Sequence, residues 1–239
     1  MRMTLRRLRR DESGFSLIEL LMAMALGSIV LTACMMVFLK GSESAVKIGD
    51  RTDSLARGRV TMNRVITLLN SQTCLVAADG TGQAPIVDGQ SDQITFYASL
   101  GKVDSDPTIY RLRYVSTSKQ VWEDRYLPSR DAANVLSYPA TPSTSQVIGT
   151  NVVPYPATTP VFQYWQFVTD EGPTLGMIDS PALTVPLTAD GRNAAVRVTV
   201  SLASVPERTG TADLRKTAME GVALVGSANP GEPAKGVNC

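Results

Sequence analysis

The sequence GFSLIELL at residues 14–21 opens an apolar segment that continues to Leu39. As a helix rising about 1.5 Å per residue, the roughly 25 residues at 15–39 are long enough to cross the hydrocarbon core of a bilayer. Glu19 lies inside this segment, where a carboxylate costs about 2.5–3.5 kcal/mol on insertion scales. A charge in such a place normally marks a functional contact, so Glu19 is the first candidate functional residue.

The residues before this segment are basic. Five arginines against two acidic residues give residues 1–14 a net charge of +3. Because the whole chain has a formal net charge of +1 at pH 7, the remainder carries −2. Basic residues beside a membrane span mark its cytoplasmic side, so we expect residues 1–14 in the cytoplasm and the rest of the chain outside it.

The composition argues against catalysis and cofactor binding. The chain has no histidine, which removes the usual general base and the commonest transition-metal ligand. It also lacks a phosphate-binding Gly-rich loop followed by Lys-Ser/Thr, a CxxC pair and a GxSxG turn. Its near-neutral charge gives no electrostatic basis for binding nucleic acid. We therefore expect no enzyme activity, no metal, no cofactor and no nucleic-acid partner.

A helical pattern continues beyond the apolar segment. No proline occurs before Pro85, and apolar residues recur at helical spacings among arginines. The apolar positions are Leu55, Met62, Val65, Ile66 and Leu69, and the basic ones are Arg51, Arg57, Arg59 and Arg64. The pattern predicts one helix from Phe15 to Asn70, apolar at residues 15–39 and then amphipathic at residues 40–72. Its arginines either face solvent or pair with acidic groups of a neighbouring chain.

Residues 73–239 are predicted to form a β-rich domain. Short runs of alternating apolar and polar residues are bounded there by Gly, Pro, Asp and Ser. The candidate strands are residues 94–97, 109–115, 121–127, 161–168, 195–203 and 221–225. Such alternation is typical of an antiparallel sheet with one buried face. Residues 128–160, rich in Pro, Ser, Thr and Ala, are predicted to be a long loop or an insertion. The expected fold is α+β, with the long helix packed on an antiparallel sheet.

Gly14, Phe15 and Glu19, with the basic leader and the apolar run, resemble the class III signal of type IV prepilins and type II secretion pseudopilins. The resemblance implies that a membrane-embedded prepilin peptidase cuts after Gly14 and that the new amino group of Phe15 is N-methylated. It also implies that Glu19 selects the N-terminus of an incoming subunit. An amine and a carboxylate from adjacent helices would neutralise each other in a low-dielectric site.

The length and the many short strands most resemble a minor pilin or a J-class minor pseudopilin. The resemblance implies a single-pass protein of the plasma (inner) membrane, with residues 1–14 as a cleaved leader. An inner-membrane assembly platform would then place it, with other pilin or pseudopilin subunits, in a pilus or pseudopilus fibre. The alternative is a signal-anchored extracytoplasmic binding domain that never polymerises and keeps its leader.

The cysteines outside the apolar segment, Cys74 and Cys239, would lie in an oxidising compartment. They either form a disulfide or remain free thiols. Cys34, inside the segment, is expected to serve packing only.

Two further groups of residues have a functional and a structural interpretation. The aromatic residues Tyr110, Tyr114, Trp122, Tyr126, Tyr164 and Trp165 could form a sugar-binding face, but strand spacing favours the core. The aspartates Asp88, Asp92, Asp104 and Asp106 could hold Ca²⁺, but without a recognised ligand spacing they favour solvated turns.

Overall fold

The computed structural model describes most of the chain after the leader. The described residues are 16–76, 81–100, 106–169, 176–179, 181–207, 216–226, 228, 231–232, 237 and 239. The predictions for the leader, Gly14, Phe15 and Asp104 therefore lie outside the described residues. The chain divides into two compact units, Met1–Gly49 and Asp50–Cys239.

One helix, α1 (Leu17–Asn70), belongs to both units. The prediction of a single long helix that ends at Asn70 is confirmed, and the absence of proline explains why nothing interrupts it. The small polar residues of its apolar half bond to the helix itself. Ser28 Oγ donates to the carbonyl of Ala25 and Thr32 Oγ1 to that of Ser28, each at 2.8 Å. These hydroxyls are therefore satisfied without water, as an apolar environment requires.

The second half of α1 packs against the β-rich domain along one stripe. Its buried residues are Ser54, Gly58, Thr61, Met62, Val65, Leu68 and Leu69. Their spacing of three to four residues is that of one helical face. The predicted stripe was wrong in part, because Leu55 and Ile66 are only half-buried. It also missed Ser54, Gly58 and Thr61, whose small side chains allow the helix to lie close to the strands.

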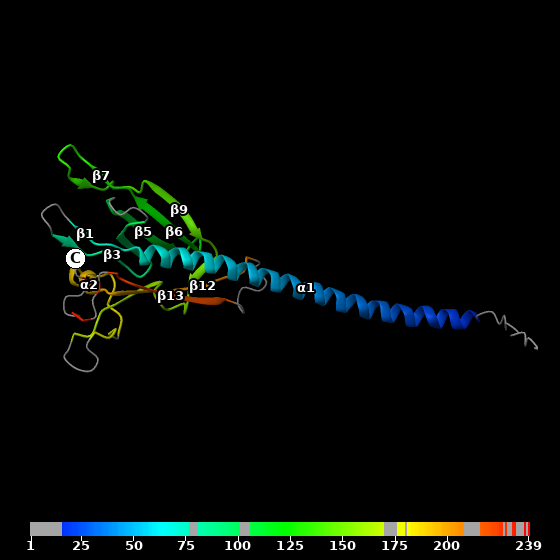
Figure 1. Ribbon diagram of the computed structural model, residues 1–239. Helices are drawn as coiled ribbons and strands as arrows, with labels where there is room; N and C mark the ends of the chain where they lie inside the picture. Colours follow the sequence, from blue (N-terminus) through cyan, green and yellow to red (C-terminus); the bar gives the residue numbers. More distant parts are fainter. Residues whose placement is uncertain are drawn as a thin grey trace, which may run out of the picture. The chain divides into compact units, whose positions relative to one another are not determined.

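Five antiparallel strands form the larger sheet, in the order β3-β4-β5-β6-β9. Figure 1 labels four of them, β3, β5, β6 and β9. They are β3 (Ile86–Gly89), β4 (Gln93–Ala98), β5 (Thr108–Val115), β6 (Gln120–Tyr126) and β9 (Thr144–Gly149). Leu112 of β5 lies between Ile94 of β4 and Glu123 of β6, which fixes the register at the centre of the sheet. Tyr110, Leu112 and Tyr114 alternate with half-buried residues along β5, as the sequence predicted.

A second antiparallel sheet is built around β12 (Arg197–Ser204). Along one edge β12 pairs with β10 (Val152–Pro154) and β11 (Phe162–Trp165), and along the other with β13 (Thr217–Leu224). The small elements are the pair β1 (Leu75–Val76) and β2 (Gly82–Gln83), the pair β7 (Ser129–Arg130) and β8 (Leu136–Ser137), and helix α2 (Ala189–Ala194).

A single hydrophobic core joins the second half of α1 to both sheets. Val65, Leu68 and Leu69 from the helix are fully buried in it, together with Phe96 and Val200 from the two sheets. In the ribbon view, the second half of α1 runs beside the labelled strands of both sheets (Figure 1). The α+β fold class predicted from the sequence is confirmed.

The prediction of a long loop at residues 128–160 was wrong. This stretch contains β7, β8, β9 and β10, and two of these strands belong to the main sheets. The first four residues of β9 are exposed, so its sequence has no buried face to produce alternation. β9 is a strand because it pairs with β6 from Val121 to Arg125. Its own pattern of apolar and polar residues does not account for it.

Candidate functional site

Glu19 lies in the first turn of α1. The backbone N–H groups of Glu19 and Leu20 donate to the carbonyl of Ser16 at 3.0 and 3.1 Å, which closes that turn. An acidic side chain near a helix N-terminus is favoured by the helix dipole. The side chain of Glu19 is exposed, so its carboxylate can accept a bond from a group outside the chain.

The surface of the helix segment that begins around Glu19 and continues to Leu39 is mostly apolar and exposed. Leu17, Leu31 and Val37 have exposed fractions of 79%, 75% and 73%. This part of α1 is long and apolar enough to span a membrane, and none of it is buried in the described structure. A helix that is apolar all round needs lipid or protein against it. The segment therefore suggests membrane anchoring.

A charged group follows the apolar segment directly. Lys47 Nζ donates to Glu43 Oε1 at 2.5 Å, and Lys40 Nζ lies 3.7 Å from Glu43 Oε2. The hydrogen bond from Lys47 lowers the pKa of the Glu43 carboxyl below its ordinary value. The helix thus changes from apolar to charged within a few residues of Leu39.

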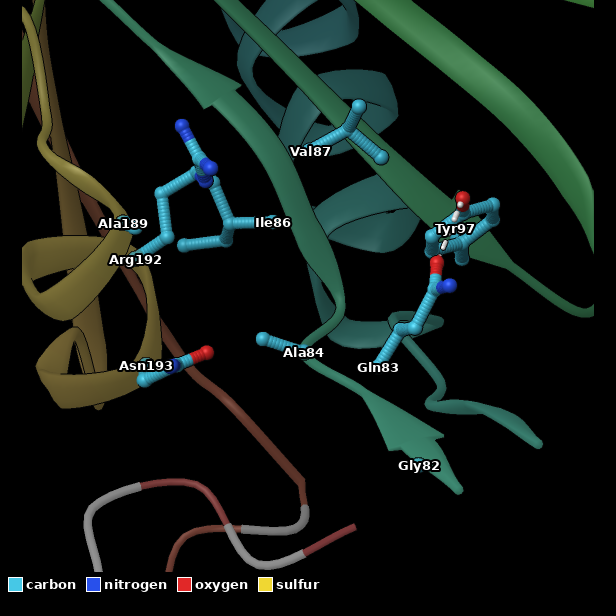
Figure 2. Close-up of a pocket in the computed structure, with 9 residues that line it drawn as sticks. All are labelled: Gly82, Gln83, Ala84, Ile86, Val87, Tyr97, Ala189, Arg192 and Asn193. Atoms are coloured by element: carbon cyan, nitrogen blue, oxygen red, sulfur yellow. Dashed lines mark hydrogen bonds between the residues drawn. The ribbon is translucent and has the colours of Figure 1, made fainter. Parts of the chain in front are cut away.

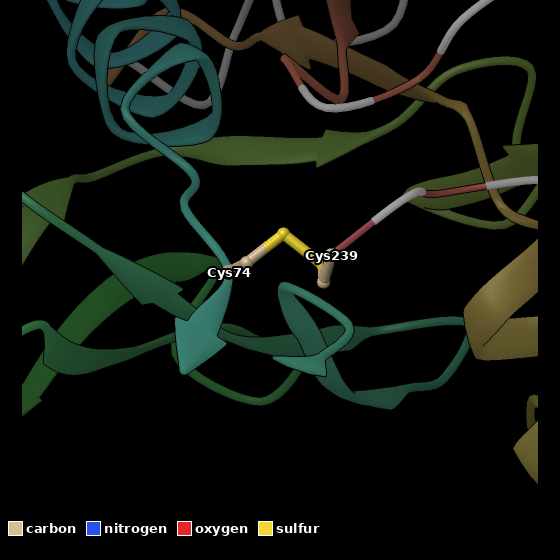
Figure 3. Close-up of a disulfide and its surroundings, with 2 residues drawn as sticks. All are labelled: Cys74 and Cys239. Atoms are coloured by element: carbon tan, nitrogen blue, oxygen red, sulfur yellow. A yellow bond between two sulfur atoms is a disulfide. The ribbon is translucent and has the colours of Figure 1, made fainter. Parts of the chain in front are cut away.

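Cys74 and Cys239 form a disulfide with Cα atoms 5.6 Å apart (Figure 3). Cys74 follows the end of α1, so the bond fixes Cys239 to the helix end. Gly82 of β2 lies against this site, because a Cβ there would come within 2.5 Å of the Cys239 backbone. The sequence left open whether these cysteines form a disulfide or remain free thiols, and the structure contains the disulfide. Cys34 is free and exposed, so its predicted packing does not occur within the described chain.

The prediction that arginines of α1 face solvent or pair with another chain was wrong for Arg64. Arg64 donates Nε to Glu123 Oε2 at 2.9 Å and Nη2 to Glu123 Oε1 at 2.8 Å. Arg57 Nη1 lies 3.8 Å from a Glu207 oxygen, also in the same chain. Arg51 and Arg59 are exposed.

Two buried carboxylates, Glu123 and Asp124, were missed by the sequence reasoning. They are adjacent on β6 and have no exposed surface. Because strand side chains alternate, they point to opposite faces of the sheet. Each receives two arginines: Arg64 and Arg125 bond to Glu123, and Arg111 and Arg113 bond to Asp124. A signal was present, since an acidic pair in one predicted strand follows two arginines at alternate positions in the preceding one.

The arginines decide the charge state of both carboxylates. Burial by itself raises the pKa of Glu123, but hydrogen bonds from Arg64 and Arg125 outweigh it and hold the pKa below its ordinary value. Burial likewise raises the pKa of Asp124, and bonds from Arg113, Ser145 and Arg111 reverse the shift. Both groups are therefore ionised in the folded protein at neutral pH.

The preference for core over sugar-binding holds for Tyr110, Tyr114 and Tyr164, which belong to the hydrophobic core. Tyr126 is also buried, but on the face of β6 that points away from this core. The Tyr164 hydroxyl donates to the carbonyls of Gln90 and Gln93 at 3.1 and 3.2 Å. The two tryptophans do not follow the prediction. Trp122 and Trp165 are half-buried, each with an arginine stacked on its ring.

Asp88, Asp92 and Asp106, the three of these aspartates that the structure describes, do not assemble a cation site. Among the residues that the structure describes, no three His, Cys, Asp or Glu side chains form a group that could hold a metal. Asp88 accepts from the amides of Gln90 and Gln93 at 2.9 and 3.0 Å, and Asp106 pairs with Arg130.

A pocket of about 310 Å³ lies between β2, β3 and helix α2 (Figure 2). Its polar wall comprises Gln83, Tyr97, Arg192 and Asn193, and the Tyr97 hydroxyl donates to Gln83 Oε1 at 3.3 Å. Among the residues that the structure describes, the lining contains no carboxylate and no cysteine. This described lining offers hydrogen bonds and one cation.

Comparison with known families bears on the N-terminal end of the chain. Residues 9–35 match the family described as prokaryotic N-terminal methylation motif. The match includes Gly14, Phe15 and Glu19, the residues singled out from the sequence. No curated protein matches the chain. The motif indicates processing and assembly of the type IV pilin or pseudopilin kind, and proteins with this motif are structural rather than enzymatic.

Proposed function

From the premise that residues 9–35 carry the methylation motif of type IV pilin-like proteins, we propose that this chain is a minor subunit of a type IV pilus or a type II secretion pseudopilus. Prepilin peptidase cuts after Gly14, and Phe15 becomes the N-methylated first residue. The observation that carries the proposal is an exposed carboxylate in the first turn of an exposed apolar helix, within that motif.

The proposed mechanism is assembly by charge pairing. In one subunit Glu19 accepts a hydrogen bond from the Phe15 amine of its neighbour, so two charges in an apolar setting neutralise each other. Removing either partner leaves the other charge unpaired in a low-dielectric site, which is strongly unfavourable. Glu19 therefore selects subunits that have been cut, because only these present a free amine at that depth.

The apolar surface of α1 supplies the second part of the mechanism. Before assembly its leucines, methionines and valines contact lipid at residues 15–39. In the fibre they contact the same segment of other subunits, so the transfer keeps apolar surface away from water. Residues 40–70 continue the helix, and residues 73–239 form a domain outside the cytoplasm. An oxidising compartment is consistent with the Cys74–Cys239 disulfide.

Substitution of Glu19 tests the assembly mechanism. We expect Glu19→Ala to be cut normally but to be strongly depleted from purified fibres. Glu43→Ala is the matched control, because Glu43 is an exposed acid on the same helix beyond the apolar segment. Normal incorporation of Glu19→Ala would contradict the pairing mechanism.

Mass analysis of the N-terminus tests processing. The cellular protein should begin at a methylated Phe15, and Gly14→Val should keep residues 1–14. A wild-type protein that starts at its encoded methionine and is absent from fibres would instead support the anchored, non-polymerising domain. A minor subunit should be scarce in fibres relative to the main subunit, and equal abundance would contradict the minor role.

A further inference from the structure

Asp124 is fully buried although its side chain points away from the core. Its neighbour Glu123 pairs across the strands with Leu112, which lies in the core, so Asp124 occupies the opposite face of the five-stranded sheet. Two arginines of β5 cover it there. Arg111 donates Nε and Nη2 to Asp124 Oδ2 at 2.9 and 2.7 Å, and Arg113 donates Nε to the same oxygen at 2.9 Å.

Aromatic rings hold the same two arginines from the side. The guanidinium carbon of Arg113 lies 4.8 Å from the ring centroid of Trp122, and that of Arg111 lies 5.5 Å from the centroid of Tyr126. The side chains of Arg111 and Arg113 remain 30% and 31% exposed. The two guanidinium groups are therefore fixed in position while part of each still faces solvent.

This arginine–tryptophan face, comprising Arg111, Arg113, Trp122, Asp124 and Tyr126, has an excess of positive charge. Two guanidinium groups share one carboxylate, and Ser145 Oγ also donates to that carboxylate. The Asp124 carboxylate thus already accepts several hydrogen bonds. Arg113, by contrast, donates only its Nε to Asp124 among the described contacts. The face has a net charge of +1 and donors left over.

The residue types on this face are those that protein interfaces favour. Trp, Tyr and Arg are enriched at the centres of interfaces, and side chains that are already fixed lose little freedom on binding. One end of the sheet face is closed by the hairpin of β7 and β8, where Tyr138 packs on Tyr97 with ring centroids 5.9 Å apart. Trp122 lies on the part that this hairpin leaves half-exposed.

We propose that the arginine–tryptophan face binds carboxylate groups of an acidic segment on a partner protein. A guanidinium group matches the planar geometry of a carboxylate, and the surplus charge favours an anion. A nucleic acid is disfavoured because it requires an extended basic surface, whereas residues after Gly14 carry a net charge of −2. This contact goes beyond assembly through α1, and Asp124 acts in it only by positioning the arginines.

The test uses the full chain in detergent micelles and a peptide of ten glutamates. In a Trp165→Phe background, Trp122 is the remaining tryptophan and reports binding by its fluorescence. We expect saturable binding that weakens with salt, and no binding of a ten-glutamine peptide. Arg113→Gln should lower the affinity about tenfold, because one charged hydrogen-bond donor is lost.

Matched variants separate this proposal from general electrostatics and from misfolding. Arg197→Gln in the same Trp165→Phe background is the control, because Arg197 belongs to β12 of the other sheet, where it lies 4.7 Å from the ring of residue 165 in the wild type, and its loss should leave the affinity unchanged. Arg111→Gln should also lower the affinity for the glutamate peptide. Calorimetry measures this affinity, under conditions in which the variant and the parent protein have equal thermal stability. Equal affinity of Arg113→Gln and the parent protein would overturn the proposal. Tighter binding of a ten-nucleotide single strand than of the glutamate peptide would also overturn it. Neither result would bear on Glu19 and fibre assembly.

Discussion

Arg64 of α1 donates two hydrogen bonds to Glu123 of β6, at 2.9 and 2.8 Å, across a sequence separation of 59 residues. Glu123 is fully buried, while the Arg64 side chain is 33% exposed. The pair joins the helix to the five-stranded sheet through a bidentate contact, which fixes direction as well as distance. The helix is therefore attached to the domain by an oriented ionic contact in addition to its apolar stripe.

Removal of Arg64 should destabilise the domain. In Arg64→Ala, Glu123 keeps Arg125 as a partner, but one of its two cations is lost from a buried site. We expect the free energy of unfolding to fall by about 2 kcal/mol, below the usual value for a buried pair because Arg64 is partly exposed. Denaturant unfolding measures the change. Arg59→Ala, at an exposed position of the same helix, should change it by less than about 0.5 kcal/mol, and an equal loss in both variants would contradict the role of the pair.

Acid should destabilise the domain through Glu123 and Asp124. Their pKa values are lower in the folded state than in the unfolded chain, so the unfolded state binds more protons as the pH falls. Their contribution is fully present above the unfolded values, about 4.3 for Glu and about 3.9 for Asp, and is lost below them. The free energy of unfolding, measured at a series of pH values from 7 to 3, should therefore stay constant at first and then decline. Glu123→Gln should start from lower stability and decline less steeply; an unchanged acid slope would exclude Glu123 as a source.

The sequence predicted well those parts of the fold that have a local cause. The absence of proline and the apolar run predict α1, and strict alternation predicts the strands β5 and β12. The expected wet face of β12 was wrong, because its polar residues Thr199 and Ser201 are buried as well. The edge strand β9 was missed because four of its residues are exposed and its pairing with β6 is a tertiary effect. At the candidate site, the apolar helix around Glu19 also has a local cause in the sequence and was predicted for that reason.

Contacts between distant residues could not be predicted from local pattern. Ser54 and Thr61 are polar, so hydrophobic periodicity assigns them to solvent, yet both are buried on the packed side of α1. The Ser54 and Ser204 hydroxyls lie 3.1 Å apart, and Thr61 Oγ1 donates to the carbonyl of Ile148 at 3.1 Å. Small residues such as these become buried where two backbone segments lie close together. Only the folded structure shows which segments those are.

Gly149 provides a test of that close approach. A Cβ at this position would lie 2.4 Å from Cγ2 and 2.7 Å from Oγ1 of Thr61, a short side chain with little freedom to move. Gly149→Ala should therefore force α1 and β9 apart and lower the free energy of unfolding by about 1–3 kcal/mol. Gly49→Ala is the control, because nothing lies within 4 Å of its Cβ and alanine favours a helix. Denaturant unfolding of both variants measures the difference, and unchanged stability of Gly149→Ala would contradict the packing described.

The Cys74–Cys239 disulfide closes a loop with a sequence separation of 165, so it strongly restricts the unfolded chain. The chain-entropy treatment assigns about 5 kcal/mol to a loop of this size, and removal of native disulfides typically costs about 2–5 kcal/mol. We expect the Cys74→Ser, Cys239→Ser double variant to lose stability in that range and to become insensitive to reductant. Cys34→Ser, which removes the exposed free cysteine, should match the wild type under oxidising conditions and lose the same stability when reduced. A wild-type protein whose unfolding does not change on reduction would show that the bond does not stabilise the fold.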